Sequence, residues 1–194
     1  SVFYLFIISL FYLDKKTLRW VFPSLILALF LSWGKNFSAL TDLMIDYFPF
    51  YDKFRAVSSI QVIIELIIPL IAAFGLYKIF EGQHQKTMSY KKIIYPSSIF
   101  LTILFLLLIF GESIFKFQSE IEVFGAYPEI LDMIANERKS IFRADVVRSI
   151  FIVSVLFASI FTVKKNYLSR KYIIPVLTII VLADLWSINK NYVN

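Results

Sequence analysis

The sequence predicts an all-α fold: a polytopic transmembrane helix bundle with interfacial amphipathic helices in its extracytoplasmic loops. Hydrophobic residues make up 59% of the 194 residues and the mean hydropathy is +0.74, whereas soluble domains contain only about 45–50% apolar residues. Apolar runs recur along the chain, and several approach the roughly 20 residues that a spanning helix needs. The connections between these runs also alternate in their content of Lys and Arg. The lipid bilayer is therefore the first predicted partner.

Six apolar segments are predicted to span the membrane as parts of one domain covering residues 1–194. The first is short and is expected to be cut off by the start of the sequence, because Ser1 is not a methionine and the apolar run has neither a basic region before it nor a small-residue cleavage site after it. The second and sixth are also short, so re-entrant or tilted segments remain alternatives for both. In order, the predicted spans cover residues 2–13, 18–33, 60–80, 93–111, 146–163 and 172–186.

The charge distribution predicts which connections face the cytoplasm. Positive residues near helix ends stay cytoplasmic, and the first, third and fifth connections are rich in Lys and Arg. The loops at residues 34–58 and 112–145 are balanced or more acidic, so these loops and the C-terminal end are predicted to be extracytoplasmic. The formal charge of +6 lies in short clusters beside apolar runs, which anionic lipid explains better than nucleic acid.

Both outer loops carry amphipathic helical patterns. Pro128 is predicted to open a helix, since the first helical turn tolerates its missing N–H, and this helix should lie along the interface before entering the fifth span. Apolar residues recur there at helical spacing, and three cations between them are predicted to be interfacial: Arg138, Lys139 and Arg143. In the first outer loop a shorter helix is predicted to be capped by Ser38 or Thr41 and to end at Pro49.

A cluster of cations and aromatic residues in the first outer loop is suited to an anionic headgroup. Arg55 offers a bidentate fork for phosphate and Lys53 a point charge. Tyr51 and its aromatic neighbours suit the depth of lipid headgroups. These three residues are predicted to bind substrate, and an interfacial anchor with snorkelling cations is the structural alternative.

Glu65 is an ionisable residue inside the third predicted span, one helical turn after Gln61. A charge at this depth costs a few kcal/mol unless it faces protein or water. Both residues are therefore predicted to line a cavity within the bundle. A neutral, hydrogen-bonded structural glutamate is the alternative.

The sequence assigns no catalytic residue and no metal ligand. Cysteine is absent and there is one histidine, which excludes thiolate sites and histidine clusters. Asp42, Asp46 and Asp52 offer carboxylate oxygens of the kind that divalent ions take. Carboxylates that balance nearby Lys and Arg are commoner in loops, so a divalent cofactor stays an open alternative.

Three stretches resemble, in this order, segments of the YfhO-like bacterial membrane proteins, especially the large versions found in Bacteroidota. They are WGKNFSALTDLMIDYFPFYDKFRAVSSIQVIIEL, YPEILDMIANERKSIFRADVVRS and ADLWSINKNYVN. That family looks like the GT-C superfamily of polytopic glycosyltransferases, which use polyprenyl-phosphate-linked sugars on the outer face of the bacterial inner membrane. The resemblance covers the C-terminal part of such a membrane domain. It implies that Lys53 and Arg55 stand near the donor phosphate and that a missing N-terminal half of the same chain supplies the catalytic aspartate.

The resulting functional expectation is part of a GT-C-like glycosyltransferase that transfers sugar from a polyprenyl-phosphate donor to a cell-envelope acceptor. The fragment by itself is expected to be inactive. The alternative is a membrane transporter or an envelope-assembly scaffold without transferase chemistry. An inverted repeat of these helices upstream would favour transport.

Overall fold

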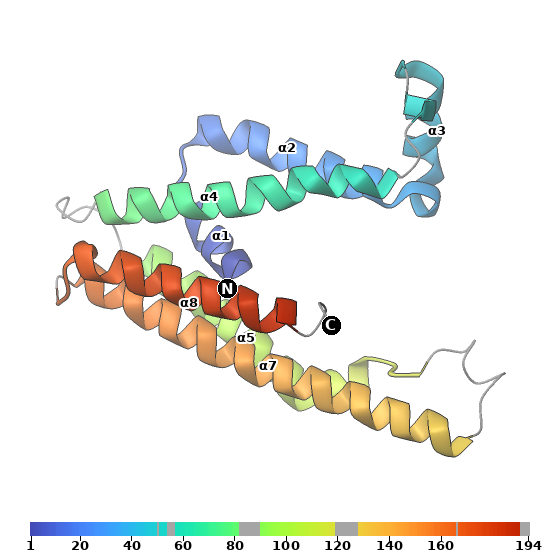
Figure 1. Cartoon of the computed structure of the whole chain (residues 1–194). Coiled ribbons are helices and arrows are strands. Elements are labelled where there is room, and N and C mark those ends of the chain that lie inside the picture. The colour runs from blue at the N-terminus through green and yellow to red at the C-terminus, as the bar shows by residue number, and fades with distance from the viewer. Residues whose placement is uncertain (50, 54–56, 82–89, 119–127, 166, 191–194) are drawn as a thin grey trace. The chain divides into compact units, whose positions relative to one another are not determined.

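The computed structural model describes residues 1–49, 51–53, 57–81, 90–118, 128–165 and 167–190. Within these residues every regular element is a helix and there is no strand, which confirms the predicted all-α class. The chain divides into two compact units, an N-terminal unit of residues 2–82 and a C-terminal unit of residues 83–194 together with Ser1. Figure 1 shows their helices.

The N-terminal unit is organised around α4, Gln61–Glu81. Helices α1, Val2–Leu10, and α2, Lys15–Ser32, both pack against α4. Short 3-10 turns at Gly34–Phe37, Tyr51–Lys53 and Val57–Ile60 flank α3, which covers Ser38–Tyr47. Helix α3 ends just before Pro49 as expected, but the predicted cap is wrong. Phe37 occupies the N-cap position, and the Thr41 hydroxyl donates to the carbonyl of Gly34 at 2.9 Å instead of accepting from a backbone N–H.

A glycine brings α1 and α4 together. A Cβ placed on Gly75 would lie 2.6 Å from Cα of Ser9, so only glycine permits this approach. Ser9 is fully buried, and its hydroxyl lies 2.7 Å from the carbonyl oxygen of Leu5 and 3.2 Å from that of Ala72. The hydroxyl therefore has acceptors within the interface, as a polar group between two apolar helices requires.

An ion pair joins the two ends of the same unit. Asp14, between α1 and α2, accepts from Nζ of Lys78 on α4. It also accepts from the hydroxyl of Thr17 at 3.1 Å. These hydrogen bonds, led by that from Lys78, lower the pKa of Asp14 from 3.8 to about 2.

In the residues that the structure describes, the helices of the C-terminal unit are α5, Lys91–Ile114; α7, Pro128–Lys164; and α8, Arg170–Lys190. Helix α7 packs against α5 and against α8. As predicted, Pro128 is the first residue of its helix. The amphipathic helix and the fifth span form one helix of 37 residues, whose charged half continues along the axis of its apolar half (Figure 1).

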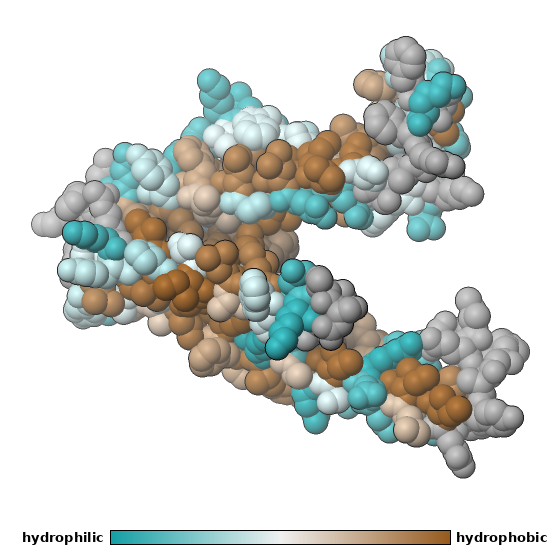
Figure 2. Space-filling view, viewed as in Figure 1, coloured by the Kyte–Doolittle hydropathy of each residue, from teal (hydrophilic) through white to brown (hydrophobic). Residues whose placement is uncertain are grey.

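Four helices of the described residues are long and apolar enough to cross a membrane: Gln61–Glu81, Lys91–Ile114, Ile130–Lys164 and Lys171–Lys190. They correspond to the last four predicted spans. Their exposed apolar side chains fit contact with a lipid bilayer, and Figure 2 shows apolar surface along α4 and α7. The first two predicted spans coincide with α1, which has only 9 residues, and α2, which begins with Lys15 and Lys16.

Candidate functional site

The predicted substrate-binding residues of the N-terminal unit lie on two elements. Tyr51 is buried and Lys53 is exposed, both in the 3-10 turn Tyr51–Lys53. Gln61 and Glu65 are exposed on α4, so the packing of this unit does not bury them, and Arg55 lies outside the described residues. The structure thus brings Tyr51 and Lys53 into one turn.

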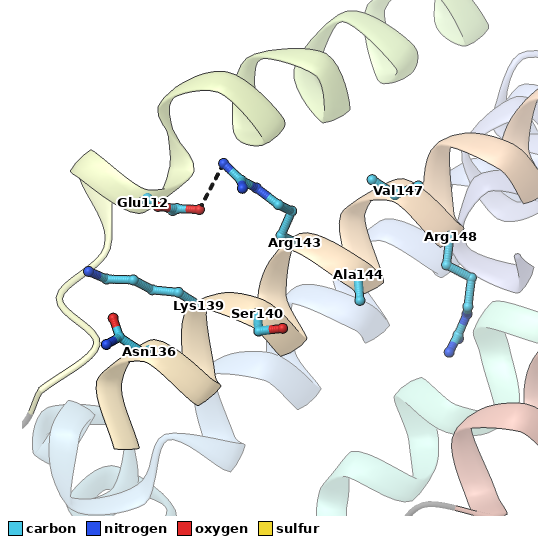
Figure 3. A pocket seen from close by; sticks show the side chains of 8 residues that line it. All are labelled: Glu112, Asn136, Lys139, Ser140, Arg143, Ala144, Val147 and Arg148. Atoms are coloured by element: carbon cyan, nitrogen blue, oxygen red, sulfur yellow. Dashed lines mark ion pairs between the residues drawn. The ribbon is translucent and has the colours of Figure 1, made fainter. Parts of the chain in front are cut away.

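A polar pocket in the C-terminal unit gathers a different set of residues. Its cavity volume is about 730 Å³ and it opens widely to the surface. Figure 3 shows its side chains on two helices, with Glu112 at the end of α5 and the rest along α7. The lining residues are Glu112, Asn136, Lys139, Ser140, Arg143, Ala144, Val147 and Arg148.

Helical periodicity places the α7 residues on one face. Asn136, Lys139 and Arg143 are separated by three and four residues, the spacing that aligns side chains along a helix. Leu131 and Ala135 precede Lys139 by eight and four residues and are buried, so they continue this stripe towards the start of α7. The stripe is therefore buried and apolar near the start of α7 and becomes polar where it lines the pocket.

A glycine sets the distance between α5 and α7 at this point. A Cβ on Gly111 would lie 2.6 Å from Cζ of Phe142, so the Phe142 ring occupies the space where a side chain would stand. The ring also packs against Phe115 and Phe117, at centroid distances of 5.6 and 5.7 Å. Gly111 and Phe142 directly precede Glu112 and Arg143 in the chain, so this contact brings the two charged residues together.

Glu112 and Arg143 form an ion pair within the pocket. Oε1 of Glu112 lies 3.2 Å from a terminal nitrogen of Arg143, and the side chains are 38% and 64% exposed. An ion pair so open to solvent stabilises a fold by only about 0–1 kcal/mol. Lys139 makes no ion pair with any residue that the structure describes. The pocket thus combines three cationic side chains with one carboxylate.

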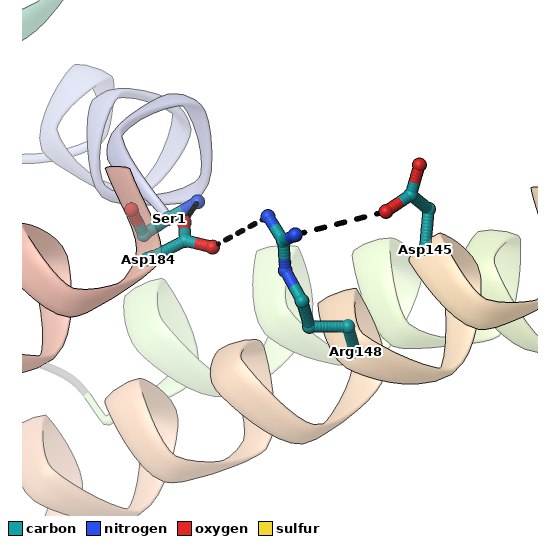
Figure 4. A network of polar contacts seen from close by, with 4 residues as sticks. All are labelled: Ser1, Asp145, Arg148 and Asp184. Carbon is teal, nitrogen blue, oxygen red and sulfur yellow. Dashed lines mark hydrogen bonds and ion pairs between the residues drawn. The ribbon is translucent and has the colours of Figure 1, made fainter. Parts of the chain in front are cut away.

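Arg148 lines the pocket from its apolar side and is held by α8. A terminal nitrogen of Arg148 lies 2.9 Å from Oδ1 of Asp184, whose side chain is only 4% exposed. The other terminal nitrogen lies 3.7 Å from Asp145, and the amino group of Ser1 lies 3.0 Å from Oδ2 of Asp184 (Figure 4). Because a charge taken from water must be paired, the Asp184 carboxylate fixes where the guanidinium stands.

The segment that follows α5 is tied to α7 by two hydrogen bonds. Arg138 donates to the carbonyl of Phe117 at 2.9 Å, and the amide of Gln118 donates to Asp132 at 3.2 Å. Of the three predicted interfacial cations, Lys139 and Arg143 therefore line the pocket, whereas Arg138 holds the neighbouring segment.

The pocket offers the chemistry of an anion site rather than that of a metal site. Among the described residues no three His, Cys, Asp or Glu side chains are grouped as a metal ion would require. Guanidinium and ammonium groups suit phosphate oxygens, and Asn136 and Ser140 add neutral hydrogen-bonding groups. No family model, curated protein or solved structure matches this chain.

Sequence reasoning missed Glu112, Arg148 and Asp184 as site residues. Arg148 and Asp184 lie inside the predicted spans 146–163 and 172–186, where an ionisable residue is itself a functional signal. Two such charges of opposite sign in consecutive spans could have been predicted to pair. No comparable signal identifies Glu112, because its role depends on the contact between Gly111 and Phe142.

Proposed function

We propose that this chain is part of a membrane-embedded glycosyltransferase and that the pocket of the C-terminal unit binds the phosphate of a polyprenyl-phosphate-linked sugar. The observation that carries the proposal is the position of Lys139, Arg143 and Arg148 where the charged half of α7 meets its apolar half. A phosphate attached to a lipid resides at that boundary, because its chain stays in hydrocarbon and its charge at the interface.

The lining residues suit the two ends of such a ligand. Lys139 and Arg143 meet the phosphate oxygens, while Ala144 and Val147 give the first carbons of the lipid an apolar wall. Asn136 and Ser140 are placed to exchange hydrogen bonds with sugar hydroxyls. These residues bind and orient the donor, and electrostatic stabilisation of the departing phosphate is their contribution to rate. The base that activates the acceptor would come from another part of the protein.

The first outer loop supplies a second set of residues to the proposal. Lys53, Arg55 and Tyr51 are proposed to approach the same class of phosphate at the membrane surface. Gln61 and Glu65 are proposed to line the donor cavity of the assembled membrane domain. This arrangement requires both outer loops on the extracytoplasmic face of a bacterial inner membrane.

A transporter or scaffold is the second candidate, and the exposure of Glu65 on α4 favours it. A carboxylate on the outer face of a membrane-length helix needs a protein or water partner, which an ion path or a docked envelope protein would provide. The upstream sequence separates the candidates. An aspartate-bearing outer loop supports the transferase, and an inverted repeat of these helices supports transport.

Binding of undecaprenyl phosphate to the full-length protein in phosphatidylcholine nanodiscs tests the pocket. The double variant Lys139→Ala/Arg143→Ala should weaken binding at least about tenfold, since each charge-assisted hydrogen bond stabilises by about 1.5–3 kcal/mol. Sugar transfer from a polyprenyl-phosphate donor should fall with it. The matched control is Lys171→Ala, which removes an exposed cation at the start of α8.

Two results would contradict the proposal. One is undiminished binding and transfer in the double variant. The other is an equal loss in Lys171→Ala, which would trace the effect to overall charge.

A further inference from the structure

The Glu112 carboxylate occupies a position that a bound anion would need. It lies 3.2 Å from Arg143, the guanidinium at the middle of the pocket face of α7, and Figure 3 shows it facing the same space as Lys139. A negative group among cations lowers the affinity of the pocket for any other anion. The Glu112 carboxylate therefore affects which anions the pocket binds.

We infer that Glu112 is a specificity-determining residue that holds Arg143 until a phosphate-bearing lipid headgroup takes its place. The inference rests on the proposed phosphate-binding role of the pocket and not on the transfer reaction. A phosphate that engages the terminal nitrogen of Arg143 facing Glu112 must displace the carboxylate, so anions that interact only weakly with Arg143 are disfavoured.

The exposure of the pair makes this exchange feasible. Glu112 and Arg143 are 38% and 64% exposed, so the pair is weak, and a displaced carboxylate is readily solvated. Glu112 forms its ion pair with Arg143 alone in the described residues. A phosphate has oxygens enough to engage both Arg143 and Lys139, which lie one helical turn apart on one face. The headgroup gains a second cation that Glu112 does not use.

The lipid source of the phosphate follows from the apolar side of the pocket. Val147 and Ala144 line it next to Arg143, and the apolar half of α7 continues beyond them. A free phosphate ion makes no use of that wall, whereas an acyl or prenyl chain does.

The test compares binding of phosphatidic acid to four forms of the full-length protein in phosphatidylcholine nanodiscs. Glu112→Gln should raise the affinity about two- to fivefold, the range expected for an exposed ion pair. Arg143→Gln should lower it. In the Arg143→Gln background, Glu112→Gln should not change the affinity further, because the guanidinium with which Glu112 pairs is already absent. Inorganic phosphate at equal concentration forms a second arm and should compete poorly.

Glu137→Gln is the matched control, because it removes an exposed carboxylate from α7 outside the pocket. It should leave the affinity unchanged. An equal rise in Glu137→Gln, a rise from Glu112→Gln that persists without Arg143, or no rise at all would overturn the inference. Equally strong binding of inorganic phosphate would overturn the lipid assignment.

Phosphatidic acid also keeps this test separate from the transferase proposal. If the affinities change as expected while sugar transfer is absent, the role of Glu112 stands and the proposed reaction fails. If transfer occurs and Glu112→Gln binds no tighter, the reverse holds. If neither the wild type nor Glu112→Gln binds phosphatidic acid, the proposed role of Glu112 is wrong.

Discussion

The two units join their main helices in similar ways but with different results. In the N-terminal unit, Gly75 admits Ser9, and one turn later Lys78 pairs with Asp14. In the C-terminal unit, Gly111 admits the ring of Phe142 and the next residues, Glu112 and Arg143, form an ion pair. In each unit a glycine that lets two helices approach closely is therefore accompanied by an ion pair nearby.

The partner of the glycine determines what the junction can do. Ser9 is small and fully buried, and its hydroxyl lies within reach of carbonyls of both helices, so α1 and α4 close on each other. Phe142 is large. Its ring fills the space above Gly111 and packs against the ring of Phe115. Beside that ring the helices leave the pocket that Glu112 and Arg143 line. A close contact thus seals the first unit, whereas a contact through a ring leaves room for a ligand in the second.

The largest expected effect is that of Gly75→Leu. The new Cβ would meet the Cα of Ser9 at 2.6 Å, and since backbone cannot yield as a side chain can, α1 would have to move from α4. We expect destabilisation of about 3 kcal/mol or more, at the upper end of overpacking costs. Thermal unfolding of the full-length protein in detergent measures it.

Ala73→Leu is the control for this change. Ala73 lies two residues earlier on α4 and is exposed, so the added volume meets no neighbour in this unit. An unchanged melting temperature in Gly75→Leu, or an equal drop in both variants, would show that the glycine contact does not hold α1.

Gly111→Ala should have an intermediate effect and should act on the pocket. Its Cβ would meet the end of the Phe142 ring at 2.6 Å, and a ring can turn aside at a cost of about 1–3 kcal/mol. Because the ring positions Arg143 against Glu112, we expect weaker binding of undecaprenyl phosphate as well as a lower melting temperature. Phe142→Leu in the same chain should restore part of both. A lower melting temperature with unchanged binding would show that the contact between Gly111 and Phe142 stabilises the unit without positioning the pocket residues.

The sequence predicts the helices of both units well but not the junctions between them. Helices α4 and α5 differ from the predicted spans by a few residues at each end, because long apolar runs and helical periodicity are local properties. Pro128 as the start of α7 is equally local. The join of the amphipathic helix with the fifth span into one helix was also predictable from the lack of a breaker around residue 146.

The pocket required contacts between distant segments. Lys139 and Arg143 were predicted to lie at the interface because they stand between the apolar residues of an amphipathic helix. Glu112 contacts Arg143 because α5 packs on α7. No local sequence pattern predicts a contact between segments so far apart in the chain. Asp184 was within reach of prediction, since a carboxylate in a predicted span needs a cation, and Arg148 stands in the preceding span.

The smallest expected effect concerns the ion pair beside the Gly75 junction. The pKa of Asp14 is lowered from 3.8 to about 2, chiefly by the hydrogen bond from Lys78. A lowered pKa means that the ionised form is favoured in the folded state, so its contribution is fully present above about pH 3.8 and is lost as the pH falls towards 2. The melting temperature should therefore drop between pH 5 and pH 2.5, and Asp14→Asn should show a smaller drop.

Asp42→Asn, which removes an exposed carboxylate of α3, is the control and should show the same drop in melting temperature as the wild type. An identical acid profile in Asp14→Asn and wild type would mean that the contact between Gly75 and Ser9 holds α1 and α4 together without this pair, which would make the two junctions less alike than their residues suggest.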